Sequence, residues 1–193
     1  MAHSIPHTLD ADAGQLLRYL QRGGNKNYYT TFDANGWPRH TWHDTGAEPP
    51  ALPAGATHFG VNPCTAIPET NKAGERALAS QVKGRVEYIA ALNCLYADFD
   101  AKDFDGSLDA TLAHVLDLTV PPSVIVASGG GYHCYWLLEE PFVLDTPEKR
   151  EQAVAIQRET FPLFYFSRHA CTTTPGGFCF RQANTYTVGV LRF

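Results

Sequence analysis

Apolar residues near the start of the chain recur at helical spacing. Leu16, Leu17 and Leu20 share one side of a helix predicted over residues 10–22, and Gly23-Gly24 ends this helix. The pattern therefore predicts an amphipathic helix with one buried face.

A strand-like pattern follows this helix. Residues 27–43 read "NYYTTFDANGWPRHTWH", in which β-prone residues flank Asn35-Gly36, a pair typical of tight turns. This arrangement predicts a β-hairpin. A proline-rich connector over 48–55, a short strand over 57–63 and a long polar loop over 64–84 are expected next.

The second half alternates strand and helix patterns more clearly. A strand from Leu92 to about Asp98 is predicted first. A helix capped by Ser107 follows, and its apolar residues are Leu108, Leu112, Val115, Leu116 and Leu118. Strands over 123–128 and 132–142, joined by a glycine turn, come next, and a helix runs from Pro147 to about Thr160. The order β-α-β-β-α is that of a ferredoxin-like or RRM-like unit. The predicted fold class is therefore α+β, with an antiparallel sheet in this unit.

Length, hydropathy and cysteine content limit the class of protein and its expected compartment. The 193 residues suffice for one domain, and no apolar run reaches the roughly 18 residues of a membrane span. The first residues lack the features of a secretory signal, and the five cysteines contain no CxxC pair. These features predict a cytoplasmic protein without a disulfide framework or a standard zinc site.

The net charge of −5 argues against a surface that coats nucleic acid broadly. A local basic groove stays possible, because basic residues gather on either side of the acidic strand end; these are Lys72, Arg76, Lys83, Arg85 and Lys102. A solvated surface of mixed charge explains the same residues equally well.

Two aspartates stand at the end of the apolar strand in "LYADFDAKDF", residues 95–104. Side chains two residues apart in a strand point the same way, so Asp98 and Asp100 project together with Cα atoms about 7 Å apart. Two carboxylates at this range repel unless a cation neutralises them. Mg²⁺ or Mn²⁺ is the expected cation, although a DxD pair is also common in surface loops.

A glycine turn and a histidine form a second cluster. Ser128 and the glycines at 129, 130 and 131 are a turn without bulky side chains, so its backbone N–H groups can approach phosphate oxygens. Strand alternation puts Tyr132, Cys134, Trp136 and Leu138 on a core face and His133, Tyr135 and Leu137 on the other. His133 is therefore expected on a face that a ligand can reach, unless it is simply an exposed histidine beside a hairpin.

Together the two clusters resemble motifs of the archaeo-eukaryotic primase superfamily, and most closely those of the primase-polymerase domains of plasmids, phages and integrated elements. An hhhDhD strand is matched by Tyr96, Ala97, Asp98, Phe99 and Asp100. An sGxGxH turn is matched by Ser128, Gly129, Gly130, Gly131, Tyr132 and His133. The resemblance is close over residues 84–142 and looser upstream, where "HFGVNP" is similar to a segment that precedes the catalytic strands.

The resemblance implies an RRM-like catalytic module over residues 85–160, packed with an N-terminal α/β module over residues 1–84. Asp98 and Asp100 would hold Mg²⁺ or Mn²⁺ in the family's reaction, template-directed nucleotidyl transfer by a DNA primase and polymerase. The nucleotide contacts would be Ser128, Gly129, Gly130, Gly131 and His133, with Arg85, Lys83 and Lys102 as further phosphate or template contacts. The implied partners are an NTP or dNTP, single-stranded DNA template and primer, and a replicative helicase domain or protein, in the replication of a mobile element.

The resemblance fails after the last predicted helix. The family has a third motif there, with another metal-binding aspartate, but no Asp or Glu occurs from Thr160 to Phe193. We expect the region over 161–193 to be an aberrant tail and the chain to be truncated or frameshifted. Codons can be chosen for Thr173 to Cys179 that read Asp-Pro-Arg-Arg-Val-Leu in another frame, a sequence like the missing stretch. Only the encoding DNA decides whether such a frame exists.

Two other functions stay open at this point. A catalytically inactive module could bind nucleotide or single-stranded nucleic acid through Tyr28, Tyr29, Phe32, Trp37 and basic residues, and the missing carboxylate favours this alternative. A metal-dependent nuclease could use the same two aspartates, but it does not account for the glycine turn and His133.

Overall fold

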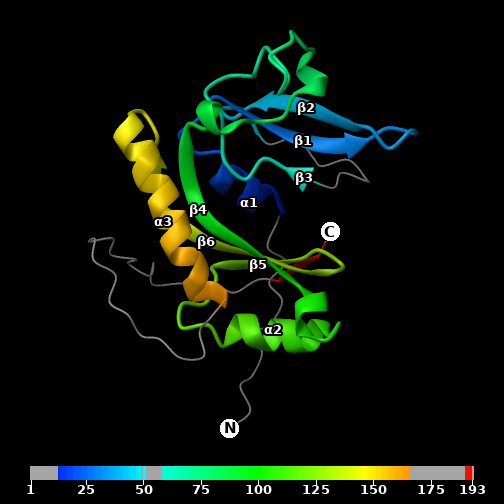
Figure 1. Cartoon of the computed structure of the whole chain (residues 1–193), viewed down its shortest axis with the longest axis vertical. Helices are drawn as coiled ribbons and strands as arrows, with labels where there is room; N and C mark the ends of the chain where they lie inside the picture. Colours follow the sequence, from blue (N-terminus) through cyan, green and yellow to red (C-terminus); the bar gives the residue numbers. More distant parts are fainter. Residues whose placement is uncertain (1–12, 49, 51–57, 166–189, 193) are drawn as a thin grey trace. The chain divides into compact units, whose positions relative to one another are not determined.

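The structure, a computed structural model, describes residues 13–48, 50, 58–165 and 190–192. The described residues form two compact units, which we name by their contents. The hairpin unit comprises residues 13–93 and 140–150, and the motif unit comprises the described residues of 94–139 and 151–193. The mixed α and β content confirms the predicted α+β class (Figure 1).

The hairpin unit contains a three-stranded antiparallel sheet. Its strands are β1 (Lys26–Phe32), β2 (Pro38–Asp44) and β3 (His58–Phe59), in the order β2-β1-β3. The carboxylate of Asp33 shapes the turn by accepting hydrogen bonds from the backbone N–H groups of Asn35 and Trp37. Gly36 has a φ of 76°, which glycine adopts without strain. The hairpin and its turn are as predicted.

Helix α1 (Ala13–Leu20) precedes this sheet, and the first residues of the predicted helix lie outside the described residues. Leu16, Leu17 and Leu20 are all buried, as their spacing predicted. The fully buried Asn93 donates hydrogen bonds from its side chain to the carbonyls of Leu20 and Arg22, at 2.9 and 2.7 Å. These bonds satisfy carbonyl groups that the end of the helix leaves without partners.

The stretch over 64–84 is a long loop, as predicted, and contains the short 3₁₀ helix η1 (Ala79–Gln81). A second 3₁₀ turn, η2 (Val86–Tyr88), leads toward β4. The expected proline-rich connector falls largely outside the described residues.

The remaining elements follow the predicted β-α-β-β-α order. They are β4 (Ala91–Asp100), the 3₁₀ helix η3 (Ala101–Phe104), α2 (Leu108–Leu116), β5 (Val124–Ala127), β6 (Gly131–Val143), α3 (Pro147–Tyr165) and β7 (Val190–Arg192). The sheet order is β4-β6-β5-β7, with β5 antiparallel to β6 and parallel to β7. Strand β4 ends two residues later than predicted, and α3 continues five residues beyond Thr160.

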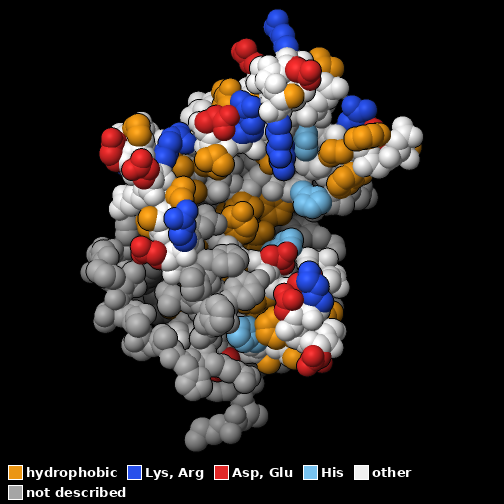
Figure 2. Space-filling model, viewed as in Figure 1, with side chains coloured by type: hydrophobic (Ala, Val, Ile, Leu, Met, Phe, Trp, Pro, Cys, Tyr) orange, Lys and Arg blue, Asp and Glu red, His pale blue; other side chains and the backbone are white. Residues whose placement is uncertain are grey.

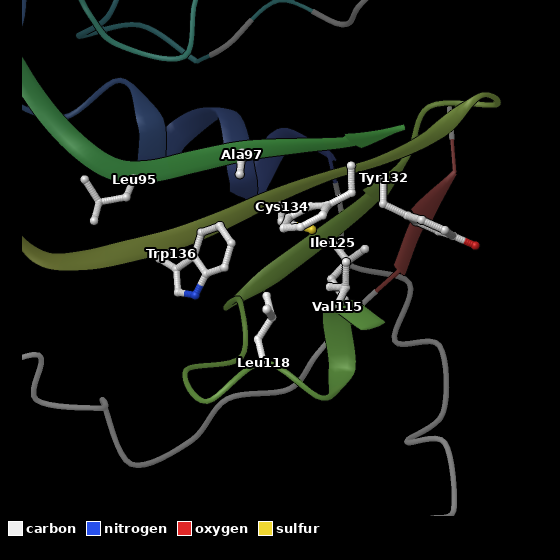
Figure 3. Close-up of a cluster of buried hydrophobic side chains, with 9 residues drawn as sticks. Leu95, Ala97, Val115, Leu118, Ile125, Tyr132, Cys134 and Trp136 are labelled. Carbon is white, nitrogen blue, oxygen red and sulfur yellow. The ribbon is translucent and has the colours of Figure 1, made fainter. Parts of the chain in front are cut away.

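The core of the motif unit lies between this sheet and α2 (Figure 3). Its buried members are Leu95, Ala97, Phe99, Val115, Leu118, Ile125, Tyr132, Cys134 and Trp136. The indole N–H of Trp136 donates to the carbonyl of Val120 at 2.8 Å, so the buried ring has a polar partner. The core face predicted for Tyr132, Cys134 and Trp136 is confirmed.

The packing of α2 differs from its predicted face. Leu108 and Leu116 are 40% and 37% exposed, whereas Thr111 is fully buried. Thr111 is tolerated there because its hydroxyl donates to the carbonyl of Ser107 at 2.7 Å. Ser107 is the predicted N-cap, and its Oγ accepts a hydrogen bond from the N–H of Ala110.

None of the helices in the described part of the chain combines the length and the apolar character that a membrane crossing needs.

Candidate functional site

Asp98 and Asp100 project from the same face of β4. The buried residues Leu95, Ala97 and Phe99 alternate with them along the strand and face the core. The side chains of Asp98 and Asp100 are 66% and 40% exposed, so water reaches both carboxylates. Strand alternation therefore places the two acids as the sequence predicted, on the side of the strand that does not face α2.

The glycine turn packs directly on the end of β4. The carbonyl of Gly130 accepts a hydrogen bond from the N–H of Ala101 at 2.9 Å, and the N–H of Ser128 donates to the carbonyl of Gly131 at 3.0 Å. A β-carbon on Gly131 would overlap the carbonyl oxygen of Phe99 and lie 2.9 Å from Cα of Asp100. The turn thus needs glycine at position 131 because the backbone of the acidic strand occupies the space.

His133 extends from β6 toward the acidic residues. It pairs in register with Val126 of β5, and its neighbours Tyr132 and Cys134 face the core instead. Its Nε2 atom lies 3.7 Å from Oδ1 of Asp98, beyond the usual hydrogen-bond distance but within ion-pair range. The imidazole is 41% exposed, so it can reach a ligand on the same face as Asp98.

Asp100 already has a cationic partner. Nζ of Lys102 lies 2.7 Å from Oδ2 of Asp100, and the N–H of Lys102 donates to Oδ1 at 3.0 Å. The side-chain hydrogen bond from Lys102, followed by its backbone N–H, lowers the pKa of Asp100. Asp100 in turn raises the pKa of Lys102. Lys102, predicted as a phosphate contact, therefore holds Asp100 in its ionised form at the start of η3.

Tyr135 is a member of this face to which the sequence pattern assigned no role. It lies two residues after His133 on β6, yet only 3% of it is exposed. Burial is the main cause that raises the pKa of Tyr135, with smaller contributions from Cys94, Cys134, Tyr96 and Asp98. Tyr135 therefore stays a neutral phenol at physiological pH, next to the strand that carries Asp98. Strand alternation could have identified it, since it put His133 and Tyr135 on one face.

The two carboxylates suit a small divalent cation. Mg²⁺ is commonly held by one or two carboxylates, with water and substrate phosphates completing its ligands. Within the described residues, no group of three or more His, Cys, Asp or Glu side chains is arranged to hold a metal ion. Among the described residues, Asp98 and Asp100 are thus a pair of candidate ligands, to which water or substrate oxygens could add. The region of the expected third motif lies mostly outside the described residues, apart from the backbone of β7 beside β5.

Arg85 and Lys83, the other predicted phosphate contacts, belong to the hairpin unit. They line a cavity of about 600 Å³ in that unit. Sequence reasoning named these residues because they are basic, but it could not predict the cavity, which depends on contacts between distant segments.

Comparison with protein-family models, curated proteins and solved structures finds no match to this chain.

Proposed function

We propose that this chain carries the nucleotidyl-transfer site of a DNA primase-polymerase, with β4, α2, β5, β6 and α3 as an RRM-like catalytic module. The observation that carries the proposal is the contact between the two motifs. The glycine turn packs on the last residues of the acidic strand, and His133 lies 3.7 Å from Asp98. The two carboxylates and the imidazole thereby lie on one face of a small sheet, with the glycine turn packed at the end of β4.

Each group has a defined role in this proposal. Asp98 and Asp100 would hold Mg²⁺ or Mn²⁺, which supplies charge stabilisation to the reacting phosphate when bound. His133, the side chain of Ser128 and the backbone of the glycines in the turn would bind the triphosphate. The 3′-hydroxyl oxygen of a primer attacks the α-phosphorus, the bond to pyrophosphate breaks, and the hydroxyl proton is lost to solvent. Template, primer and an NTP or dNTP are the partners, and a replicative helicase would open the duplex.

Lys102 gains a specific role from its position. Its ammonium group lies beside Asp100 and is 75% exposed. An arriving phosphate can therefore attract the ammonium group away from Asp100 and free that carboxylate for the divalent cation. The side chain would then neutralise phosphate charge, as the sequence predicted for Lys102.

A primer-extension assay tests the proposal. The full chain is incubated with labelled dNTPs or NTPs, single-stranded template with and without primer, and Mg²⁺ or Mn²⁺. We expect extended products that disappear in Asp98→Asn, while circular dichroism and the unfolding midpoint stay unchanged. Release of mononucleotides without extension would instead indicate a nuclease, and the proposal would be wrong.

A catalytically inactive binding module is the second candidate. The engagement of both Asp100 oxygens by Lys102 favours it, because this contact competes with a divalent cation. Calorimetry separates the two functions. Nucleotide that binds with the same affinity in the presence of EDTA, and is never turned over, would support the inactive module.

A further inference from the structure

The cavity of the hairpin unit combines aromatic and cationic side chains. Its volume of about 600 Å³ falls in the range of about 300–1,000 Å³ that small-ligand sites occupy. Strands β1, β2 and β3 and the loop after β3 all contribute to its lining. The aromatic and cationic lining residues are Tyr28, Phe32, Phe59, Lys72, Lys83 and Arg85, together with His40 and His58.

Two anchored loop segments bring the cations to this cavity. The side chain of Asn71 accepts hydrogen bonds from the N–H groups of Ala73 and Glu75 and so shapes the turn that carries Lys72. The indole N–H of Trp42 donates to the carbonyls of Ala79 and Val82, next to Lys83. Hydrogen bonds from the indole of Trp42, rather than ion pairs, therefore fix this loop on β2.

The cations receive little neutralisation from the protein. Among the described residues, neither Lys72 nor Lys83 has a carboxylate within 4.0 Å, and no described lining residue is acidic. Arg85 pairs with Glu87 at 3.0 Å, but its Nε is buried and has no hydrogen-bond partner among the described residues. Lys72 and Lys83 therefore leave positive charge at the cavity wall that no described carboxylate pairs, and this charge favours an anion in the cavity.

The aromatic residues offer ring surfaces beside these charges. The ring of Tyr28 lies 5.6 Å from that of His40 and 4.8 Å from that of Trp42, so packing fixes its orientation. Phe32 is 49% exposed, with its ring 6.1 Å from that of His58. Figure 2 shows hydrophobic side chains together with Lys, Arg and His side chains over the part of the molecule that holds β1, β2 and β3. Ring surfaces next to cations are what a base and its phosphate require.

We infer that this cavity binds one unstacked nucleotide of a single-stranded nucleic acid. The base stacks against Phe32, and the adjacent phosphates contact Lys72 and Lys83, while the guanidinium of Arg85 adds positive charge to the cavity wall. A single strand is favoured over a duplex because a paired base cannot enter a concave site. The choice of a strand as ligand rests partly on the proposed function. Binding is therefore measured without nucleotide or divalent ion, so that its failure and the failure of catalysis are distinguishable.

The test uses fluorescence anisotropy with the full chain in EDTA. The probes are fluorescein-labelled oligothymidylate and oligouridylate, each about twelve nucleotides long, since sites on single-strand binding folds span about 4–16 nucleotides. We expect Lys72→Gln and Lys83→Gln each to weaken binding several-fold. Each should also reduce the slope of log affinity against log salt by about 0.7, the value for one lost phosphate contact. Lys26→Gln is the matched control, because it removes a lysine from β1 that does not line the cavity.

A second pair of variants tests base stacking. Phe32→Ala should weaken binding about ten-fold, as expected for one lost stacking partner. Trp37→Ala should not, because Trp37, a candidate binding residue from the sequence alone, is 68% exposed in the hairpin turn and outside the cavity lining. Both side chains are exposed, so neither change should unfold the protein.

Several outcomes would overturn the inference. These are no binding at low salt, equal losses in the lysine variants and their control, or tighter binding to a duplex of the same length. Because the probes are measured without nucleotide or divalent ion, each of these outcomes is independent of nucleotidyl transfer.

Discussion

Nε2 of His133 lies 3.7 Å from Oδ1 of Asp98, although 35 positions separate the two residues in the chain. The pair joins the end region of the acidic strand to the strand that follows the glycine turn. A ligand that binds both a cation on Asp98 and the imidazole of His133 would have to lie on this face. The relationship defines which substitutions should affect metal binding and which should affect nucleotide binding.

Asp98→Asn should weaken Mn²⁺ binding and reduce nucleotide incorporation at least about 100-fold. Mutation of residues that only hydrogen-bond to a metal ligand already lowers metal affinity or activity about 10–100-fold. The substitution keeps the size of the side chain and removes its charge, so stability should change little. Calorimetric titration with Mn²⁺ and the extension assay measure both effects. Asp117→Asn is the matched control, because Asp117 is an exposed aspartate at the C-cap of α2. Equal Mn²⁺ affinity in the two variants would contradict a metal role for Asp98.

His133→Gln should act mainly on nucleotide affinity. Loss of a charge-assisted hydrogen bond to phosphate costs about 1.5–3 kcal/mol, so KM for nucleotide should rise about ten-fold or more. Affinity for Mn²⁺ without nucleotide should stay unchanged, because the imidazole is not proposed as a metal ligand. Steady-state kinetics together with Mn²⁺ titration separates the two quantities. A loss of metal affinity equal to that of Asp98→Asn would show that His133 has a different role.

Gly131→Ala should destabilise the protein by about 1–3 kcal/mol or more, as overpacking of a tight contact does. The added methyl group would overlap the carbonyl of Phe99, which is backbone and cannot rotate away. Gly130→Ala is the control in the same turn, since no described atom lies within 4 Å of its β-carbon position and its φ is not positive. Urea unfolding of both variants measures the difference. Similar midpoints would mean that the turn does not pack on β4 as described.

Lys102→Met should raise the pKa of Asp100 toward its ordinary value of about 3.9. Lys102 is the main cause that holds the pKa of Asp100 low, through its side-chain hydrogen bond. The pKa of Asp100 is lower in the folded protein than in the unfolded chain. The pair with Lys102 therefore stabilises the folded protein at pH values above the unfolded-state pKa. This stabilisation is lost as the pH falls through the folded-state pKa. Carboxyl carbon shifts followed by NMR from neutral to acid pH measure the change.

Lys149→Met provides the comparison for that titration. Lys149 lies 2.7 Å from Asp145, and its side-chain hydrogen bond is the main cause that lowers the pKa of Asp145. This variant should raise the pKa of Asp145 and leave that of Asp100 unchanged. If either variant changed the pKa values of both Asp100 and Asp145, the two ion pairs would not be independent and the prediction would be wrong.

Ser107→Ala should lower the free energy of unfolding by about 1 kcal/mol, the usual cost of losing an N-cap. The Oγ of Ser107 accepts from the N–H of Ala110 at 3.1 Å, and alanine leaves this N–H without that partner. Ser107→Asp retains an acceptor at the same position and should preserve stability. Denaturant unfolding monitored by circular dichroism tests both variants, and equal losses would rule out the capping role.

Cys64, Cys94 and Cys134 should react with thiol reagents only through unfolding. Burial raises the pKa of Cys64 to about 11 and those of Cys94 and Cys134 to about 12. At pH 7.5 fewer than about one in a thousand of each would be the reactive thiolate. Labelling with iodoacetamide, mapped by mass spectrometry with and without urea, checks this. Rapid labelling of any of the three in the folded protein would contradict its burial.

Features that depend on neighbours along the chain followed from the sequence. The alternation of β4 put Asp98 and Asp100 on one face, the turn at Asn35-Gly36 defined the hairpin, and Ser107 marked the start of α2. These are local effects of backbone geometry, and a few residues suffice to specify them. The buried face of α2 was predicted less well, because the partners that bury Thr111 and leave Leu116 exposed are distant in sequence.

Contacts between distant segments were decided only by the tertiary structure. The sequence contained Gly131, but its need for glycine arises from the carbonyl of Phe99, which folding brings against it. The sequence also contained Lys72, Lys83 and Arg85, but a cavity arises only because Asn71 and Trp42 fix their loop beside the hairpin. The chemistry of each residue and the alternation of side chains along a strand can be predicted from the sequence. Close packing and the lining of a cavity depend on which distant segments come into contact on folding.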